Sequence, residues 1–180
     1  YLLWDKQSLC YGALKAAQAL DDARLALQTL DPDLREGKGI LLDVDTPLGR
    51  VVLSGKDGGE YDVQDCLLWL DLGGNDEYHG APAGSRAGSL PVSALLDLSG
   101  KDRYESTDGG LGAGLLGLGL LVDVEGNDRY TSISRSQGFG QFGFGLLADL
   151  AGDDEYTMES SGQGAGCFGM GLQLDADGDD

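Results

Sequence analysis

DLGGNDEY, at residues 71–78, is the stretch that decides the fold, because close copies of it recur from there to residue 180. The copies are DLSGKDRY at 97–104, DVEGNDRY at 123–130, DLAGDDEY at 149–156 and a partial DADGDD at 175–180. The leading aspartates lie at 71, 97, 123, 149 and 175, so each copy begins 26 residues after the one before. A fixed period of this length is typical of one structural unit stacked on itself.

Each full repeat contains an acidic turn, a polar strand that includes a tyrosine, and a glycine-rich strand. In-register stacking would place the tyrosines in one ladder: Tyr78, Tyr104, Tyr130 and Tyr156. We expect three apolar columns to form the core: Leu116, Phe142, Phe168; Leu118, Phe144, Met170; and Leu120, Leu146, Leu172. Glycines alternate with these columns. They indicate either close approach of a second backbone layer or a bent, irregular strand.

This pattern predicts a mainly β fold, a parallel β-helix or β-solenoid with 26-residue coils. A β-propeller is disfavoured because its blades need roughly 40–50 residues. A stack of antiparallel hairpins is the main structural alternative.

Residues 1–34 have a different composition, with alanine and leucine at helical spacings and a single glycine, Gly12. Pro32 ends the pattern. We expect a helix over residues 2–30 that packs on the first coil as an N-terminal cap. Residues 40–70 read as degenerate first coils, in which 53–61 is a worn repeat with Val52 in place of the leading aspartate and two residues inserted before Tyr61. Regular repeats follow at 71–96, 97–122, 123–148, 149–174 and, in part, 175–180.

The acidic turn, for example GGNDEYHG at residues 73–80, resembles the calcium-binding nonapeptide of repeats-in-toxin proteins, G-G-x-G-x-D followed by a large apolar residue. The resemblance implies a parallel β-roll in which calcium lies between turns, held by aspartate carboxylates and backbone carbonyls. It covers about six residues of each repeat. The period of 26 departs from the family's nine, and an aspartate stands where the family has its first glycine.

Stacking the turns produces two ladders of carboxylates, which we take as the candidate metal ligands: Asp71, Asp97, Asp123, Asp149 and Asp175 in one, and Asp76, Asp102, Asp128, Asp154 and Asp180 in the other. Like charges directly opposite one another destabilise a sheet, so something must offset the repulsion. One candidate is a hard cation, for which ligands that are all oxygen point to Ca²⁺. The other is capping of turns by backbone amides, with no ion bound. The sequence leaves both open.

The charge and hydropathy of the chain disfavour several classes of partner. A formal net charge of -19 disfavours nucleic acid and anionic membrane surfaces, and no hydrophobic run is long enough for membrane insertion. Repeated identical groups do not assemble a unique catalytic constellation, so we predict no catalytic or cofactor-binding residues. The chain starts at Tyr1 and stops inside a repeat, and we expect a segment of a larger extracytoplasmic protein, whether extracellular, at the cell surface or periplasmic.

Our first hypothesis is therefore a structural or interaction module, an acidic, glycine-rich repeat protein with calcium or hydrogen bonds at its turns. A protein partner or self-assembly would use a solenoid face or the N-terminal helix. The alternative is a polysaccharide-binding or polysaccharide-active β-helix domain, which rests on fold analogy alone.

Overall fold

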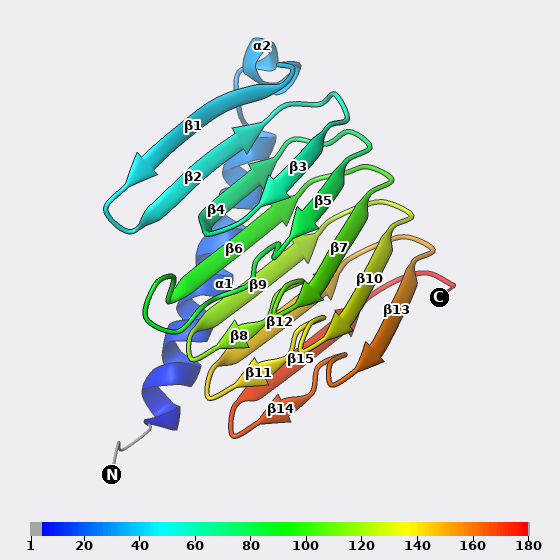
Figure 1. Cartoon of the computed structure of the whole chain (residues 1–180). Coiled ribbons are helices and arrows are strands. Elements are labelled where there is room, and N and C mark those ends of the chain that lie inside the picture. Colours follow the sequence, from blue (N-terminus) through cyan, green and yellow to red (C-terminus); the bar gives the residue numbers. More distant parts are fainter. Residues whose placement is uncertain (1–4, 180) are drawn as a thin grey trace.

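The computed structural model describes residues 5–179, which form a parallel β-solenoid with a long helix along one side (Figure 1). The helices are α1 (Lys6–Gln28) and the short α2 (Pro32–Arg35). A seven-stranded sheet contains, in spatial order, β1 (Ile40–Thr46), β2 (Gly49–Ser54), β4 (Cys66–Asp71), β6 (Val92–Asp97), β9 (Leu118–Asp123), β12 (Phe144–Asp149) and β15 (Met170–Asp175).

Two further sheets complete the coils. A five-stranded sheet contains β3 (Glu60–Val63), β5 (Glu77–Gly80), β7 (Arg103–Asp108), β10 (Arg129–Ser134) and β13 (Glu155–Ser160). A three-stranded sheet contains β8 (Gly114–Leu115), β11 (Gly140–Gln141) and β14 (Gly166–Cys167). Among the strands of residues 5–179, only β1 runs antiparallel to its neighbour, β2, and it covers the edge of the large sheet at the N-terminal end of the stack.

Strand pairing follows the 26-residue period. Asp97 of β6 pairs with Asp123 of β9, and Tyr104 of β7 pairs with Tyr130 of β10, all in parallel register. The parallel solenoid is thus confirmed, and the alternative of antiparallel hairpins is wrong. The worn first copy has a different register from the one expected. Ser54, not Val52, lies opposite Asp71, and Tyr61 lies opposite Tyr78, so no residues are inserted there.

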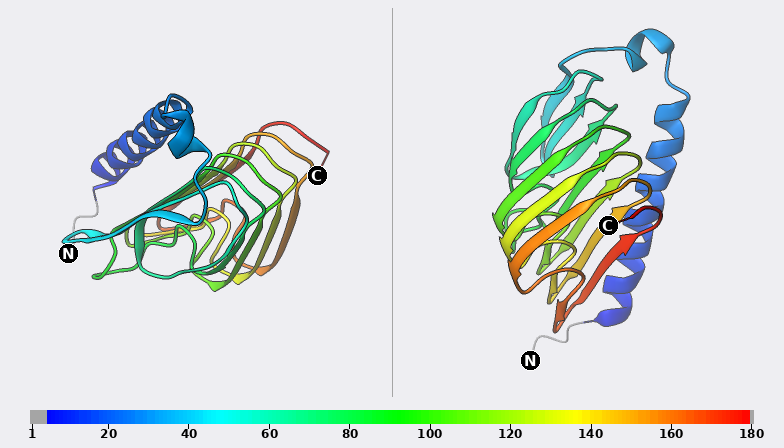
Figure 2. Two further views of the ribbon diagram at one scale, coloured as in Figure 1. Left: turned by 90° about the horizontal axis from the view of Figure 1, so that it is seen from above. Right: turned by 90° about the vertical axis from the view of Figure 1, so that its right-hand side faces the viewer.

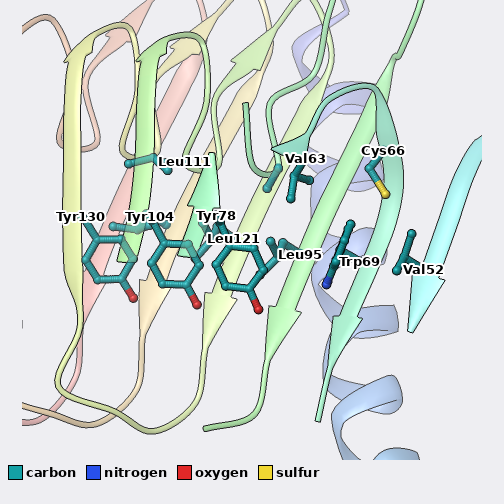
Figure 3. Packing of buried hydrophobic residues seen from close by; sticks show 12 residues of the cluster. Val52, Val63, Cys66, Trp69, Tyr78, Leu95, Tyr104, Leu111, Leu121 and Tyr130 are labelled. Carbon is teal, nitrogen blue, oxygen red and sulfur yellow. The ribbon is translucent and has the colours of Figure 1, made fainter. Parts of the chain in front are cut away.

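The tyrosine ladder is the centre of the core. Neighbouring rings of Tyr78, Tyr104, Tyr130 and Tyr156 stack with centroids 4.9 Å apart and planes within 6° of parallel. Figure 3 shows three of these rings with their hydroxyls on the same side. One inward-facing residue from each of five strands of the large sheet packs in the same core: Val52, Trp69, Leu95, Leu121 and Leu147.

The position of α1 differs from the prediction. The helix is present, but it runs along the stack, against the outer face of the large sheet, and does not sit over the end of the first coil (Figures 1 and 2). Near its start, Cys10 Sγ lies 3.8 Å from Met170 Sδ of the last strand. Its buried Leu20 and Leu27 belong to a second apolar cluster with outward-facing residues of the sheet: Leu96, Leu120 and Leu146. The sheet is therefore apolar on both faces, and α1 covers the outer one.

The three predicted apolar columns have different environments. Leu120 and Leu146 are buried, and Leu118 and Phe144 are partly buried in the same cluster beneath α1. The prediction is wrong for Leu172 of the last strand, which is 48% exposed. The first column is wrong as core, since Leu116, Phe142 and Phe168 are 60%, 40% and 74% exposed. These three residues lie at a corner where φ is between 45° and 56°, so the chain turns there and carries their side chains outwards.

Close approach of a second backbone layer explains the glycines between the columns. A Cβ added to Gly119 would lie 2.2 Å from the carbonyl oxygen of Ala113, and one added to Gly145 would lie 2.3 Å from that of Phe139. Both distances are far below normal contact. The three-stranded sheet therefore lies directly against the inner face of the large sheet, and only glycine leaves room for it.

Candidate metal centre

The first aspartate of each repeat points into the solenoid. Asp71, Asp97, Asp123 and Asp149 end strands of the large sheet, two residues beyond Trp69, Leu95, Leu121 and Leu147, so they share the inward face. All four are fully buried. One oxygen of each, Oδ1, accepts a hydrogen bond from the backbone amide two residues later, at 2.9–3.2 Å. These residues are therefore the turn-formers that one of the two interpretations described.

Their other oxygen meets the tyrosine ladder. The hydroxyl of Tyr78 lies 2.7 Å from Oδ2 of Asp71 in its own coil and 2.7 Å from Oδ2 of Asp97 in the next coil. Tyr104 repeats the arrangement with Asp97 at 3.2 Å and Asp123 at 2.6 Å. Carboxyl and phenol oxygens thus form a continuous line along the solenoid axis from Asp71 to Asp123.

The tyrosine hydroxyls of this line have fewer protons to donate than they have contacts with carboxyl oxygens. A tyrosine hydroxyl has one proton to donate, and burial raises the pKa of Tyr78 well above its ordinary value, so the phenol stays neutral. Tyr78 can donate to one of its two carboxylates only. The other contact needs a proton on that carboxyl, or a cation close to it, because two bare oxygens at 2.7 Å repel.

The second aspartate of each repeat links successive coils. Oδ1 of Asp102 accepts a hydrogen bond of 2.6 Å from the amide of Asp76, which lies 26 residues earlier. Asp128 and Asp154 do the same for the amides of Asp102 and Asp128, both at 2.6 Å. In the first coil, Oδ1 of Asp76 accepts from the amide of Gly59 at 2.5 Å. These bonds tie each acidic turn to the turn before it.

The remaining oxygens of this second ladder are the unusual atoms of the site. The Oδ2 atoms of Asp76, Asp102 and Asp128 are buried and accept no hydrogen bond from residues 5–179. Each folds back over a glycine of its own turn. An added Cβ at Gly74 would lie 2.7 Å from Oδ2 of Asp76, and one at Gly100 would lie 2.3 Å from Oδ2 of Asp102. The glycine in D-x-x-G-x-D therefore makes room for a carboxylate.

The two ladders meet in groups of three carboxyls, which we call triads. In each triad, one oxygen from every carboxyl lies within 4.8 Å of the others. A calcium ion holds its oxygen ligands at about 2.3–2.6 Å, so oxygens on one ion are separated by up to about 5 Å. The spacing and the ligand type thus fit an ion, with water or carbonyls needed to complete the shell. The triads are Asp71, Asp76, Asp97; Asp97, Asp102, Asp123; and Asp123, Asp128, Asp149.

Burial is the main cause of the raised pKa values of the aspartates in this column. It raises the pKa of Asp76 to about 7 and that of Asp102 to about 8, and neighbouring carboxylates add to the effect. Burial and the charges of Asp123 and Asp71 also raise the pKa of Asp97 well above its ordinary value. Without a bound cation, part of the column must therefore hold protons near neutral pH.

A groove of about 470 Å³ passes along the second ladder and gives access from solvent. Its walls include Asp76, Asp102 and Asp128 together with charged residues of both signs, the half-buried Glu77 and the exposed Lys101, Arg103, Arg129 and Glu155. Water could enter here to complete the coordination of an ion.

The predicted ligands thus separate by position. Seven belong to the triads, while Asp154 and Asp175 lie at the open end, where Tyr156 donates to Oδ2 of Asp175 at 2.7 Å. Asp180 lies outside the described residues.

The tyrosines were missed as part of the site. Their constant position seven residues after the first aspartate was the available signal.

No helix within residues 5–179 has the length and apolarity needed to cross a membrane. Comparison with protein-family models, with curated proteins and with solved structures finds no match to this chain.

Proposed function

We propose that the chain is a structural and interaction module, a stiff β-solenoid whose acidic turns bind calcium between successive coils. The proposed ligands are the seven aspartates of the triads, with Asp154 and Asp175 as further candidates at the open end. Cross-linking by calcium would offset the repulsion within the column and hold neighbouring coils together. We place the module outside the cytoplasm, where calcium-binding modules work with dissociation constants of about 10⁻⁴–10⁻³ M.

One observation carries this proposal: Asp76 and Asp102 are members of triads, and the buried Oδ2 atom of each accepts no hydrogen bond from residues 5–179. A buried charged oxygen without a partner is costly, so it calls for a proton or a cation. The hydrogen bonds from backbone amides of the preceding coil use the Oδ1 atoms and leave these oxygens unexplained. The two interpretations of the aspartates are therefore compatible, since one oxygen can cap while the other binds.

Thermal unfolding with calcium, and then with excess chelator, tests the proposal at constant ionic strength. Calcium at about 100 times its dissociation constant should add about 2.7 kcal/mol per site. For a chain of this size, that corresponds to roughly 5–10 °C per site in the melting temperature. Sodium at equal ionic strength should not reproduce the gain.

Asp102→Asn sharpens the test, because asparagine can still accept the amide of Asp76 while its side chain loses the negative charge. We expect a smaller calcium response, together with equal or greater stability in chelator, since repulsion in the column falls. Asp45→Asn, at an exposed position in β1, is the matched control and should keep the full response. If the unfolding temperature changed with neither calcium nor chelator, hydrogen bonds and protonation would explain the aspartates better than a bound ion.

Partner binding through a solenoid face or through α1 is part of the same proposal. Exposed apolar side chains are present on both, Phe142 and Phe168 at the corner and Tyr11 and Leu14 on α1. The rings of Phe142 and Phe168 stack with centroids 5.1 Å apart, which extends the repeat to the surface. A polysaccharide-binding or polysaccharide-active domain remains the alternative proposal.

A further inference from the structure

His79 is the only histidine of the chain, and it interrupts a column of the repeat. It lies on β5, one residue after the buried Tyr78, so its imidazole faces outwards from the five-stranded sheet. The equivalent positions of the two neighbouring coils hold carboxylates, Asp62 on β3 and Glu105 on β7. A nitrogen ligand therefore stands among carboxylates, outside the two aspartate ladders.

Both ring nitrogens of His79 face carboxylates. Nε2 lies 3.5 Å from Oε1 of Glu60 and 4.0 Å from Oε2 of Glu77. Nδ1, on the other side of the ring, lies 3.4 Å from Oε2 of Glu105. The four residues come from three adjacent strands, β3, β5 and β7, which pair in parallel register. The imidazole side chain is 34% exposed, so solvent reaches the group.

The Nε2 side of the ring has the ligand types and the spacing of a zinc site. Zinc binds imidazole nitrogen at about 2.0–2.1 Å and carboxylate oxygen at about 2.0–2.2 Å, so the ligand atoms of a tetrahedral site are about 3.4 Å apart. The 3.5 Å contact with Glu60 is close to this value. The carboxylates of Glu60 and Glu77 are on exposed and half-exposed side chains, which can close the remaining distance.

Two further contacts orient these ligands. An imidazole that binds a metal through one nitrogen commonly donates its other N–H to a carboxylate, which fixes the tautomer and the direction of the ring. Glu105 is placed to accept from Nδ1 in this way. Oε1 of Glu77 accepts a hydrogen bond of 3.2 Å from Arg103, so that Oε2 is the oxygen left towards His79.

The charges of the group also suit a divalent ion. Glu60, Glu77 and Glu105 carry three negative charges, and Arg103 supplies one positive charge. A neutral imidazole leaves two negative charges uncompensated among these residues, and one divalent cation balances them. A protonated imidazole would balance only one of the two.

We propose that His79, Glu60 and Glu77 bind a zinc ion between β3 and β5, with Glu105 as the residue that positions the imidazole and water as the fourth ligand. Imidazole nitrogen suits zinc, whereas calcium takes oxygen ligands, so this site differs in kind from the triads and is independent of the proposed function. A zinc ion here ties the degenerate coil that contains β3 to the first regular repeat, which contains β5.

Isothermal titration calorimetry with ZnCl₂ tests the site, in protein already saturated with CaCl₂. We expect one zinc ion per chain. His79→Gln removes the nitrogen ligand and should weaken zinc binding by more than about 100-fold, and Glu105→Gln should weaken it by about 10-fold, as expected for a carboxylate that orients a ligand. Glu159→Gln, at an exposed position of β13 in the same sheet, is the matched control for lost charge and should leave zinc affinity unchanged.

Nuclear magnetic resonance of the imidazole gives a second readout, because zinc should shift the Nε2 signal and leave Nδ1 protonated. Circular dichroism checks that each variant is folded. Zinc affinity that His79→Gln leaves unchanged, or no zinc bound beside calcium, would overturn the site. Equal effects of Glu105→Gln and Glu159→Gln would overturn the positioning role of Glu105.

Calcium-dependent thermal unfolding separates the two proposals. His79→Gln should keep the full calcium response, and Asp102→Asn should keep zinc binding, because the two sites share no ligand. Loss of the calcium response in the natural chain would count against the triads and leave the zinc site standing.

Discussion

Tyr104→Phe removes one oxygen from the centre of the column and leaves the ring in place. The hydroxyl is fully buried and contacts Oδ2 of Asp123 at 2.6 Å and Oδ2 of Asp97 at 3.2 Å. A hydrogen bond to a charged group contributes about 1.5–3 kcal/mol, and the longer contact counts for less. The stacking at 4.9 Å on both sides of the ring is preserved. We therefore expect a loss of about 3 kcal/mol in the free energy of unfolding.

Urea unfolding and calorimetry, both in chelator, would measure this loss, and the melting temperature should fall by roughly 6–12 °C. Tyr11→Phe is the matched control, because Tyr11 is 64% exposed, and it should change stability by less than about 0.5 kcal/mol. Tyr156→Phe should give an intermediate loss, since its hydroxyl bonds Asp175 at the half-buried end of the stack. If Tyr104→Phe and Tyr11→Phe behaved alike, the phenol–carboxyl line would contribute nothing, and our account of the core would be wrong.

Three further predictions follow from burial and close contact. Burial raises the pKa of Asp102 to about 8, so folding favours its protonated form, and this stabilisation is fully present below the unfolded pKa of about 4. In chelator, the free energy of unfolding should therefore fall as pH rises from about 4 to about 8. Greater stability at pH 8 than at pH 5 in urea titrations would contradict this. Gly119→Val would place its Cβ 2.2 Å from the carbonyl oxygen of Ala113, so it should cost more than about 4 kcal/mol or prevent folding. Gly12→Ala, in α1, would place its Cβ 3.8 Å from Leu118, so circular dichroism melts should show it to be neutral or stabilising. Leu20→Ala, at a 6% exposed position on the face of α1 that packs against the sheet, should cost about 2–5 kcal/mol, while Leu25→Ala, at a 48% exposed position of the same helix, should cost less than about 1 kcal/mol. Equal losses in chemical denaturation would mean that α1 does not cover the sheet in solution.

The candidate site was predictable in its residues but not in its chemistry. The period alone brings Asp97 over Asp123 and Asp102 over Asp128, because in-register stacking superposes equivalent positions. It does not reveal that the two oxygens of one carboxyl have different partners, which depends on where the turn places nearby amides. Nor does it reveal that Tyr104 reaches across the interior to both Asp97 and Asp123, since that distance depends on how closely two sheets approach.

The repeat by itself predicted the parallel solenoid, the tyrosine ladder and the two aspartate ladders, since a constant period superposes equivalent residues in a parallel stack. The strand pairing then excluded the antiparallel hairpins that the sequence had left open. Tertiary structure decided which surfaces are covered. Leu120 and Leu121 are adjacent, so both faces of the sheet are apolar, a pattern typical of a sheet buried on two sides. The interior fills one face, and α1 must cover the other, which is why the helix lies along the stack and not over its end. Leu116 and Phe142 are exposed for a related reason, because the left-handed backbone at the corner turns them away from both apolar layers.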